Sequence, residues 1–247
     1  MSKQISKVNL LMPIAGDARR FTEKGYSRPK PLLKTRGMPI IDWAMESINT
    51  KMCNIIFVVK GQHVRDYGID KELLNRYPDA SIVVANSQTD GALSSCLLAE
   101  HLIYNAQPLC IFTPDARFVP VFNPTSVPEV ADGYTLVHDC DKASGSYCRI
   151  DTHGVWRVSE VVEKAMPPIS RHCNVGVYWF RTGFDFCHAA HNMIANSEWV
   201  NGEFYIAPVF NKMIKQGGIV LAKNLDHVDV LGTPQDLEEF ESNELHV

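Results

Sequence analysis

Short apolar segments alternate with helix-period segments through the first half of the chain, and this alternation constrains the fold more than any other feature. Apolar runs typical of buried strands lie at Val8–Ile14, Asn54–Val59, Ser81–Ala85 and Leu109–Thr113. Helical periodicity lies between them at Ile40–Ile48, Val64–Tyr77 and Ala92–Tyr104. Such alternation predicts a parallel sheet with helices on both faces, and ligands of such sheets bind at the carboxyl ends of the strands.

The second half of the chain, after Asp115, has shorter and more closely spaced strand patterns. They lie at Tyr134–Asp139, Ser146–Ile150, Val155–Glu163, Val175–Phe180, Ile219–Leu221 and Val228–Leu231. Asp151-Thr152-His153-Gly154 predicts a hairpin turn within this set. Helices are expected at Gly183–Ala195, at Glu203–Gln216 and after Thr233, which is a suitable N-cap. Because no linker or repeat interrupts the pattern, we expect one α/β domain with an antiparallel-rich second half.

Charge and cysteine content exclude several classes of protein. With 24 Lys+Arg against 28 Asp+Glu, the net charge of −4 argues against an extended nucleic-acid surface but not against a small phosphate ligand. The seven cysteines form no CxxC motif, as expected for thiols in a reducing compartment. No apolar run approaches the ~20 residues of a membrane span, and the N-terminal apolar stretch fits a buried strand better than a signal peptide. We therefore expect a cytoplasmic protein that binds neither nucleic acid nor membranes.

A glycine and several cations follow the first predicted strand. Backbone N–H groups can approach a phosphate closely at Gly16, and Arg20 and Lys30 can add charge-assisted hydrogen bonds. Pro29 and Pro31 flank Lys30 and restrict the backbone that presents it. By composition alone, an ordinary polar surface loop explains this segment equally well.

Asp115 is the residue that stands out most clearly on its own. It follows the buried run Leu109–Thr113 and so lies at the edge where parallel sheets bind ligands. Other reactive residues have weaker patterns. His188 and His191 share a helix face, but no second pair of ligands has matching spacing, so we expect no zinc site there. Neither Cys96 nor Cys173 lies in a nucleophile motif, and buried thiols are usually inert.

Several short motifs occur in a fixed order along the chain. The first loops read Pro13-Ile14-Ala15-Gly16, Arg20-Phe21, Gly25-Tyr26 and Pro29-Lys30-Pro31-Leu32. Later pieces are Gln88-Thr89-Asp90-Gly91-Ala92, Asp115, Val162-Glu163-Lys164, Asn174-Val175-Gly176-Val177-Tyr178, Asn201-Gly202-Glu203-Phe204-Tyr205 and Gly232-Thr233-Pro234-Gln235-Asp236-Leu237. From about Asn9 to Phe240, the chain therefore resembles the sugar-1-phosphate nucleotidyltransferases, also called nucleoside-diphosphate-sugar pyrophosphorylases.

This resemblance implies a fold and a reaction. The fold would be a single Rossmann-like nucleotidyltransferase domain over residues 1–247, with a mixed, mostly parallel central sheet flanked by helices. In the reaction, a sugar phosphate would attack the α-phosphorus of a nucleoside triphosphate (NTP), giving an NDP-sugar and pyrophosphate. Mg²⁺ and positioned cations would stabilise the developing negative charge.

The resemblance also implies a catalytic and metal-binding set. Arg20 and Lys30 would hold the triphosphate, and Asp115 would bind Mg²⁺ as a hard oxygen ligand. Asp229 is the nearest candidate for a second metal carboxylate, although it stands one residue away from the usual position. In a strand, that shift turns a side chain to the other face unless a bulge intervenes.

The remaining implied residues bind the two substrates. The nucleotide would contact Ala15, Gly16, Gln88 and Gly91. The acceptor would contact Glu163, Lys164 and Asn174, the first and last through sugar hydroxyls and Lys164 through the phosphate. The Gln88 amide weakly favours a pyrimidine base.

Two departures from the family pattern keep other interpretations open. Ala18 and Arg19 stand where the family usually has a glycine and a serine or threonine, and Asp229 is displaced. One alternative is a member that binds nucleotide or nucleotide-sugar without turnover. Another is a cytidylyltransferase for a non-sugar phosphate such as phosphocholine. The sequence leaves open the acceptor, the base and whether the chain forms a homo-oligomer.

Overall fold

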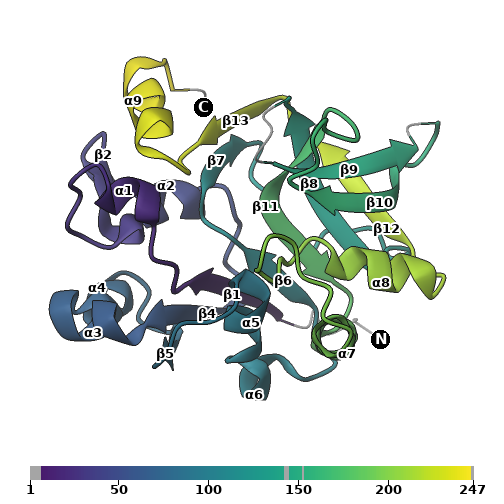
Figure 1. Ribbon diagram of the computed structural model, residues 1–247, viewed down its shortest axis with the longest axis horizontal. Helices are drawn as coiled ribbons and strands as arrows, with labels where there is room; N and C mark the ends of the chain where they lie inside the picture. The colour runs from purple at the N-terminus through teal and green to yellow at the C-terminus, as the bar shows by residue number, and fades with distance from the viewer. Residues whose placement is uncertain (1–6, 142–144, 152, 246–247) are drawn as a thin grey trace.

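A nine-stranded sheet forms the centre of the protein, in the order β5-β4-β1-β6-β11-β8-β12-β10-β9 (Figure 1). The computed structural model describes residues 7–141, 145–151 and 153–245. The strands are β1 (Val8–Ile14), β4 (Cys53–Lys60), β5 (Ser81–Ala85), β6 (Leu109–Phe112), β8 (Gly133–Asp139), β9 (Ser146–Asp151), β10 (Arg157–Glu163), β11 (His172–Phe180) and β12 (Val220–Asn224).

The two ends of this sheet differ in strand direction. Strands β5, β4, β1 and β6 are mutually parallel, as the sequence predicts. From β6 onward the pairings are antiparallel, apart from the parallel pair β8 and β12. Strand β9 also pairs with β11, so the last five strands close on themselves. The sheet is mixed, and the expectation of a mostly parallel one is not confirmed. The helical crossovers that parallel strands require are largely confined to the first half of the chain.

Helices cover both faces of the sheet. They are α1 (Arg19–Thr22), α2 (Ile40–Met45), α3 (Gly61–Tyr67), α4 (Ile69–Arg76), α5 (Ala92–Leu97), α6 (Glu100–Ile103), α7 (Gly183–Ala195), α8 (Val209–Lys215) and α9 (Pro234–Ser242). In β1, Leu10 and Met12 join the core under α2 and α4, whereas Leu11 joins the core under α5 to α8. This alternation follows from the two-residue period of a strand.

Two small sheets and a short 3₁₀ helix complete the fold. Strand β7 (Ala116–Val119) follows β6 and pairs antiparallel with β13 (His227–Val230). Strands β2 (Lys34–Thr35) and β3 (Met38–Pro39) form a hairpin after the 3₁₀ turn at Lys30–Leu32. Helix α9 begins after Thr233, whose hydroxyl accepts from the Asp236 N–H at 3.1 Å, confirming the predicted N-cap.

Four predicted helices were too long. The segment Ala92–Tyr104 is divided into α5 and α6, and α2 ends at Met45 rather than Ile48. The segment 64–77 contains parts of two helices, because Gly68 adopts φ 62° and ends α3 before α4 begins. A backbone at positive φ is left-handed and cannot continue a right-handed helix. The helix expected from Glu203 begins only at Val209, after Pro208. The hairpin pairing of β9 with β10 is confirmed, while Thr152 of its connecting turn lies outside the described residues. Within the described ranges, none of the helices has the length and apolar character needed to cross a membrane.

Candidate active site

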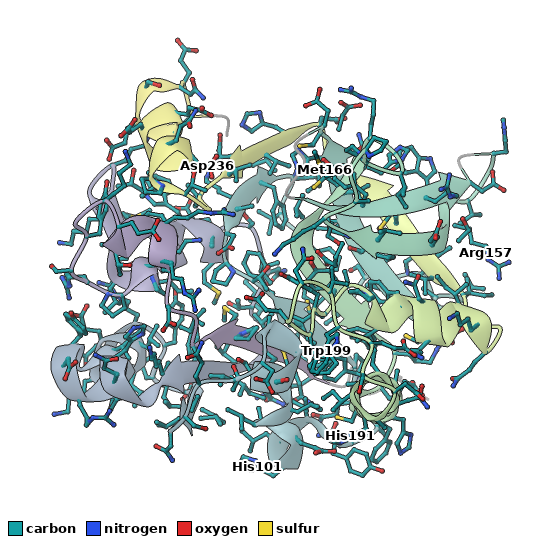
Figure 2. All side chains as sticks on the ribbon, viewed as in Figure 1. His101, Arg157, Met166, His191, Trp199 and Asp236 are labelled. Carbon is teal, nitrogen blue, oxygen red and sulfur yellow. The ribbon has the colours of Figure 1, made fainter. Side chains whose placement is uncertain are left out.

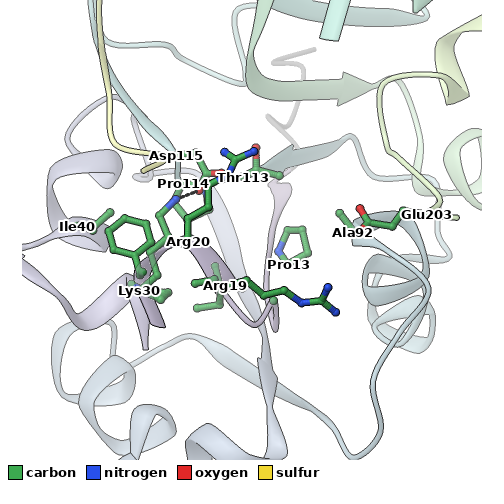
Figure 3. Close-up of a pocket in the computed structure, with 16 residues that line it drawn as sticks. Pro13, Arg19, Arg20, Lys30, Ile40, Ala92, Thr113, Pro114, Asp115 and Glu203 are labelled. Atoms are coloured by element: carbon green, nitrogen blue, oxygen red, sulfur yellow. Dashed lines mark hydrogen bonds and ion pairs between the residues drawn. The ribbon is translucent and has the colours of Figure 1, made fainter. Parts of the chain in front are cut away.

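A cavity of about 450 Å³ opens at the carboxyl ends of β1 and β6 (Figure 3). The loop that leaves β1 forms one wall, through Gly16 and Ala18. Ala18 adopts φ 49° and ψ 44°, the left-handed conformation that directs the chain into α1. The predicted edge of the sheet therefore carries the cavity, as expected for strands whose carboxyl ends meet there.

Lys30 and Asp115 meet at this cavity from segments 85 residues apart. The Lys30 ammonium donates to Asp115 Oδ1 at 2.6 Å and lies 5.6 Å from the centre of the Phe21 ring. The Lys30 side chain is only 13% exposed, whereas that of Asp115 is 58% exposed. The ammonium is thus held in place from within the protein, while the carboxylate faces the open cavity.

Two adjacent arginines add positive charge in different directions. Figure 3 shows the Arg20 guanidinium directed toward Asp115 and Thr113, close to Lys30. The Arg19 side chain extends across the cavity on the side of Ala92. Both arginines lie in α1, directly after the left-handed turn. The cationic groups predicted to hold a triphosphate are therefore together, and Arg19 adds a further one.

Lys60 is a cation near this loop that sequence reasoning missed. It ends β4, the parallel neighbour of β1, and its ammonium forms an ion pair with Asp17. The Lys60 ammonium holds the pKa of the Asp17 carboxyl below its usual range. The sequence could have indicated Lys60, because it directly follows the predicted strand Asn54–Val59 and parallel strands place their last residues along the same edge.

A second cavity, of about 330 Å³, adjoins the first and contains the residues expected to contact the nucleotide. It is lined by Ala15, Gly16, Gln88 and Gly91 among others. Gly91 has φ 111°, and a Cβ on it would lie 2.5 Å from the Phe204 carbonyl oxygen. Glycine is therefore required here so that the chain can approach the backbone of Phe204 closely.

A third cavity, of about 320 Å³, contains two of the predicted acceptor residues, Glu163 and Asn174. Glu163 ends β10 and is 8% exposed, and burial raises the pKa of its carboxyl from 4.5 to about 6. A hydrogen bond from Ser146 partly opposes this rise in pKa. Ser146 lies directly across from Glu163 in the β9–β10 pair.

Asn174 is held by several internal hydrogen bonds. Its Nδ2 donates to Ser146 Oγ at 2.9 Å, and its Oδ1 accepts from the Thr135 hydroxyl at 2.8 Å. The Cys148 thiol also donates to that oxygen at 3.4 Å. Asn174 therefore links β11 to β8 and β9 at the cavity wall, a structural role that its sequence motif did not reveal.

Lys164 lies beside the third cavity rather than at its lining. Its ammonium donates to the Tyr205 hydroxyl and lies 4.5 Å from the centre of the Tyr205 ring. Tyr205 itself lines the cavity. It belongs to the motif Asn201-Gly202-Glu203-Phe204-Tyr205, for which the sequence predicted no role in the site.

Asp229 does not join Asp115. Its carboxylate accepts from the buried Arg117 guanidinium at 3.1 Å and lies 3.1 Å from His227 Nε2. Its neighbours Val228 and Val230 line the third cavity instead. The period of a strand turns consecutive residues to opposite faces, and β13 pairs with β7 in unbroken register, so no bulge returns Asp229 to the site. The expected second metal carboxylate is therefore bound elsewhere.

The two histidines on α7 have partners of their own. His188 Nε2 lies 3.0 Å from the Tyr104 hydroxyl, and His191 Nε2 lies 2.8 Å from Glu100. Figure 2 shows His191 at the opposite edge of the molecule from Asp236 on α9.

The fold was compared with known proteins. No protein-family model matches the chain, and no curated protein matches it in sequence. Solved structures do match. A nucleoside-diphosphate-sugar pyrophosphorylase from Vibrio cholerae RC9 has a TM-score of 0.79 at 23% identity, over 95% of this chain and all of that one.

Two further structures extend the comparison. An inositol-1-phosphate CTP transferase from T. maritima has a TM-score of 0.71 at 16% identity, covering 94% of this chain and 91% of that one. A CTP:phosphocholine cytidylyltransferase from Streptococcus pneumoniae has a TM-score of 0.67 at 16% identity, covering 95% and 98%. The chain thus has a nucleotidyltransferase fold. Within that class, it shares the fold of a nucleoside-diphosphate-sugar pyrophosphorylase over 95% of its length, so the resemblance based on the ordered motifs is confirmed at the level of fold.

Proposed function

We infer that the protein is a nucleotidyltransferase that joins an NTP to a phosphorylated acceptor, and that residues 1–247 form one such domain. The observation that carries this inference is the meeting of three cavities at Ala92. The middle cavity contains Arg20, Lys30 and Asp115, and the flanking cavities contain Gln88 on one side and Glu163 on the other. A substrate pair with a base, a phosphate chain and a polar acceptor matches this arrangement.

The phosphate groups would occupy the middle cavity. Arg20 and Lys30 would neutralise the triphosphate and the charge that builds on the bridging oxygen as pyrophosphate leaves. Lys30 is already positioned by Asp115 and by the Phe21 ring, so little reorganisation is needed during the reaction. The backbone at Gly16 is open to solvent, and a close approach by a phosphate is unobstructed there.

Asp115 fits Mg²⁺. Mg²⁺ usually keeps several waters and binds through one or two carboxylates together with substrate phosphates, so the loss of Asp229 from the site does not remove the binding position. Asp115 is exposed to the cavity and lies beside the expected phosphate groups. Bound there, the ion would polarise the phosphoryl oxygens and orient the two substrates.

The third cavity favours a hydroxylated acceptor such as a sugar phosphate. Its polar lining includes Glu163, Ser146 and Asn174, which suit hydroxyl groups. A quaternary ammonium group, as in phosphocholine, is best held against aromatic faces. Here the Lys164 ammonium already lies over the Tyr205 ring, so that face is occupied.

Gln88 supports the choice of a pyrimidine nucleotide. It is exposed at the second cavity, where its amide can donate to and accept from the edge of a base.

Binding without turnover is the second candidate, and two observations favour it. The Arg19 guanidinium extends across the middle cavity, where the family usually has a hydroxyl side chain. The Asp229 carboxylate is committed to Arg117.

Pyrophosphate release distinguishes the two candidates. Each of UTP, CTP, dTTP, ATP and GTP would be paired with a panel of sugar 1-phosphates and with phosphocholine, in the presence of Mg²⁺. We expect release with a pyrimidine nucleotide and a sugar phosphate, and a loss of about 10²–10³-fold in the Asp115→Asn variant.

The matched control is Asp79→Asn, at an exposed aspartate in the turn before β5. It should leave turnover unchanged. Tight nucleotide binding by calorimetry with no pyrophosphate release from any pair would support the second candidate. Full activity of Asp115→Asn would remove the role proposed for that carboxylate.

A further inference from the structure

A histidine and two cysteines gather where β8 ends and β11 begins, apart from the phosphate site. In the β8–β11 pair, Cys173 lies directly opposite His138. Cys140 is two residues after His138, and its N–H donates to the Arg171 carbonyl at 2.9 Å, which continues the same register. Residues two apart share a face of a strand, so His138, Cys140 and Cys173 project to the same side.

The ligating atoms of these three side chains are close together. The imidazole nitrogen and the two sulfurs all lie within 4.8 Å of one another. In a tetrahedral zinc site, bonds of about 2.3 Å to sulfur and 2.0 Å to nitrogen place the ligand atoms about 3.6–3.8 Å apart. Small rotations of the side chains would therefore close the set around one ion. Among the described residues, this is the one group of three such ligands.

The chemistry of the donors selects the kind of ion. Two thiolates and an imidazole are soft to borderline donors, which suit Zn²⁺ and bind Mg²⁺ poorly. Three protein ligands leave a fourth position open. A cavity of about 480 Å³, lined by all three residues and by His227, provides room for water or another ligand at that position.

We propose that His138, Cys140 and Cys173 form a binding site for a zinc-like divalent cation with one open coordination position. This site is separate from the Mg²⁺ position expected at Asp115 and does not depend on the proposed function.

Cys173 is the buried thiol of the set. Burial raises the pKa of this thiol to about 12, and a protonated thiol is a poor nucleophile. A divalent cation would replace the thiol protons, so binding should release protons and strengthen as the pH rises.

The site also lies next to the third cavity, which is the proposed acceptor cavity. His138 and Cys173 line both that cavity and the larger one behind it. Cys173 directly precedes Asn174, whose amide bonds to Ser146 across the strands. An ion bound here would fix the start of β11 against the end of β8 at the wall of the acceptor cavity.

Cobalt substitution tests the proposal on the full-length reduced protein. We expect one Co²⁺ per chain, with the intense visible bands of tetrahedral cobalt and thiolate-to-cobalt charge-transfer absorption, both abolished by one equivalent of Zn²⁺. Cys140→Ser and Cys173→Ser should each weaken Zn²⁺ binding by more than the roughly 10–100-fold that loss of an outer-shell partner causes. Circular dichroism would confirm folding, and the half-exposed Cys140 provides a variant that should fold even if Cys173→Ser does not.

Matched controls are Cys53→Ser for the half-buried thiol and Cys187→Ser for the buried one. Both should keep the cobalt spectrum. An octahedral spectrum, no cobalt uptake, or a spectrum unchanged in both cluster variants would overturn the proposal. Loss of two hydrogens through a Cys140–Cys173 disulfide, with no uptake by the reduced protein, would also overturn it and identify a redox pair.

Discussion

The first cavity, where we propose that the phosphates bind (the phosphate cavity), differs in construction from the third, where we propose that the acceptor binds (the acceptor cavity). At the phosphate cavity, Arg19 and Arg20 are exposed on a four-residue helix, and Asp115 is 58% exposed. At the acceptor cavity, Glu163 is buried and Asn174 is held by Ser146 and Thr135.

This difference matches the ligands that we propose. A triphosphate brings its own charge and a hydrated ion, so cations on a surface loop can adapt to it. Sugar hydroxyls differ only in orientation, so their partners must be fixed beforehand for selective binding. The parallel end of the sheet provides the open edge, and the closed antiparallel end provides the rigid wall.

The largest expected effect on stability concerns Asp229, whose strand neighbours Val228 and Val230 line the acceptor cavity. Its carboxylate is 6% exposed and pairs with Arg117, which is 9% exposed. Removing Asp229 takes the buried carboxylate away from Arg117, which keeps its contact with Glu46 at 3.4 Å, so Asp229→Ala should lower the free energy of unfolding by up to about 3–5 kcal/mol. Asp115→Ala is the matched comparison and should lower it by less than about 1 kcal/mol. Urea denaturation measures both, and equal losses would contradict the contrast between the two sides.

Substitution of Lys30 tests the phosphate cavity by its effect on the reaction rate. Lys30→Ala removes the cation positioned beside Asp115, and we expect kcat/KM for pyrophosphate release to fall by about 10²–10³-fold. Lys34→Ala, at an exposed lysine in the following strand β2, should leave kcat/KM unchanged. A loss below about 10-fold at Lys30 would show that Arg20 or the metal carries the phosphate charge without it.

Glu163, in the acceptor cavity, should make the free energy of unfolding depend on pH. Its pKa is raised to about 6 from 4.5, so the protonated form is favoured in the folded protein. The resulting stability is fully present below pH 4.5 and is lost as the pH rises through 6. From below pH 4.5 to above pH 6, the free energy of unfolding of Glu163→Gln should therefore rise by about 2 kcal/mol relative to that of the unchanged protein.

Urea denaturation at pH 4.5 and pH 7.5 would measure this gain. Glu160→Gln, at an exposed position on the same strand, is the control and should show little pH-dependent difference. A pH-independent difference for Glu163→Gln would mean that the carboxyl group is solvated rather than buried.

Ala18 gives the smallest expected effect. At φ 49° its Cβ is strained, so Ala18→Gly should raise the free energy of unfolding by up to about 1 kcal/mol. Ala15→Gly, in the same loop but without positive φ, should lower it by about 0.5–1 kcal/mol. If both variants lower stability, the left-handed turn is not the source of strain in this loop.

Periodicity and neighbouring residues predicted most of the elements. β1, β5 and α7 have the predicted bounds, because each has an uninterrupted apolar pattern. The helix over 64–77 was wrong, since a single glycine at Gly68 took a left-handed conformation that periodicity does not report. The antiparallel-rich second half was also predicted and is confirmed, but the parallel pair β8 and β12 and the closure of β9 on β11 depended on which strands meet in space, which no local pattern contains.

The residues of the candidate site likewise fall into those that the sequence predicted and those that it did not. Lys30 and Asp115 were chosen from their own segments, and the structure brings them to 2.6 Å. Lys60 was missed because its place at the edge depends on the partner of its strand. The metal role of Asp229 stays unsupported, because the register between β13 and β7 directs it to Arg117.

By itself, the sequence determined the strand–helix order, the cationic loop after the first strand and the carboxylate after β6, because these depend on residue types and short spacings. Only the tertiary structure decided which side chains share a cavity, how the sheet closes and which polar groups are already bound. Those outcomes arise from strand register and from contacts between distant segments. One step of register reverses the face of every side chain on a strand.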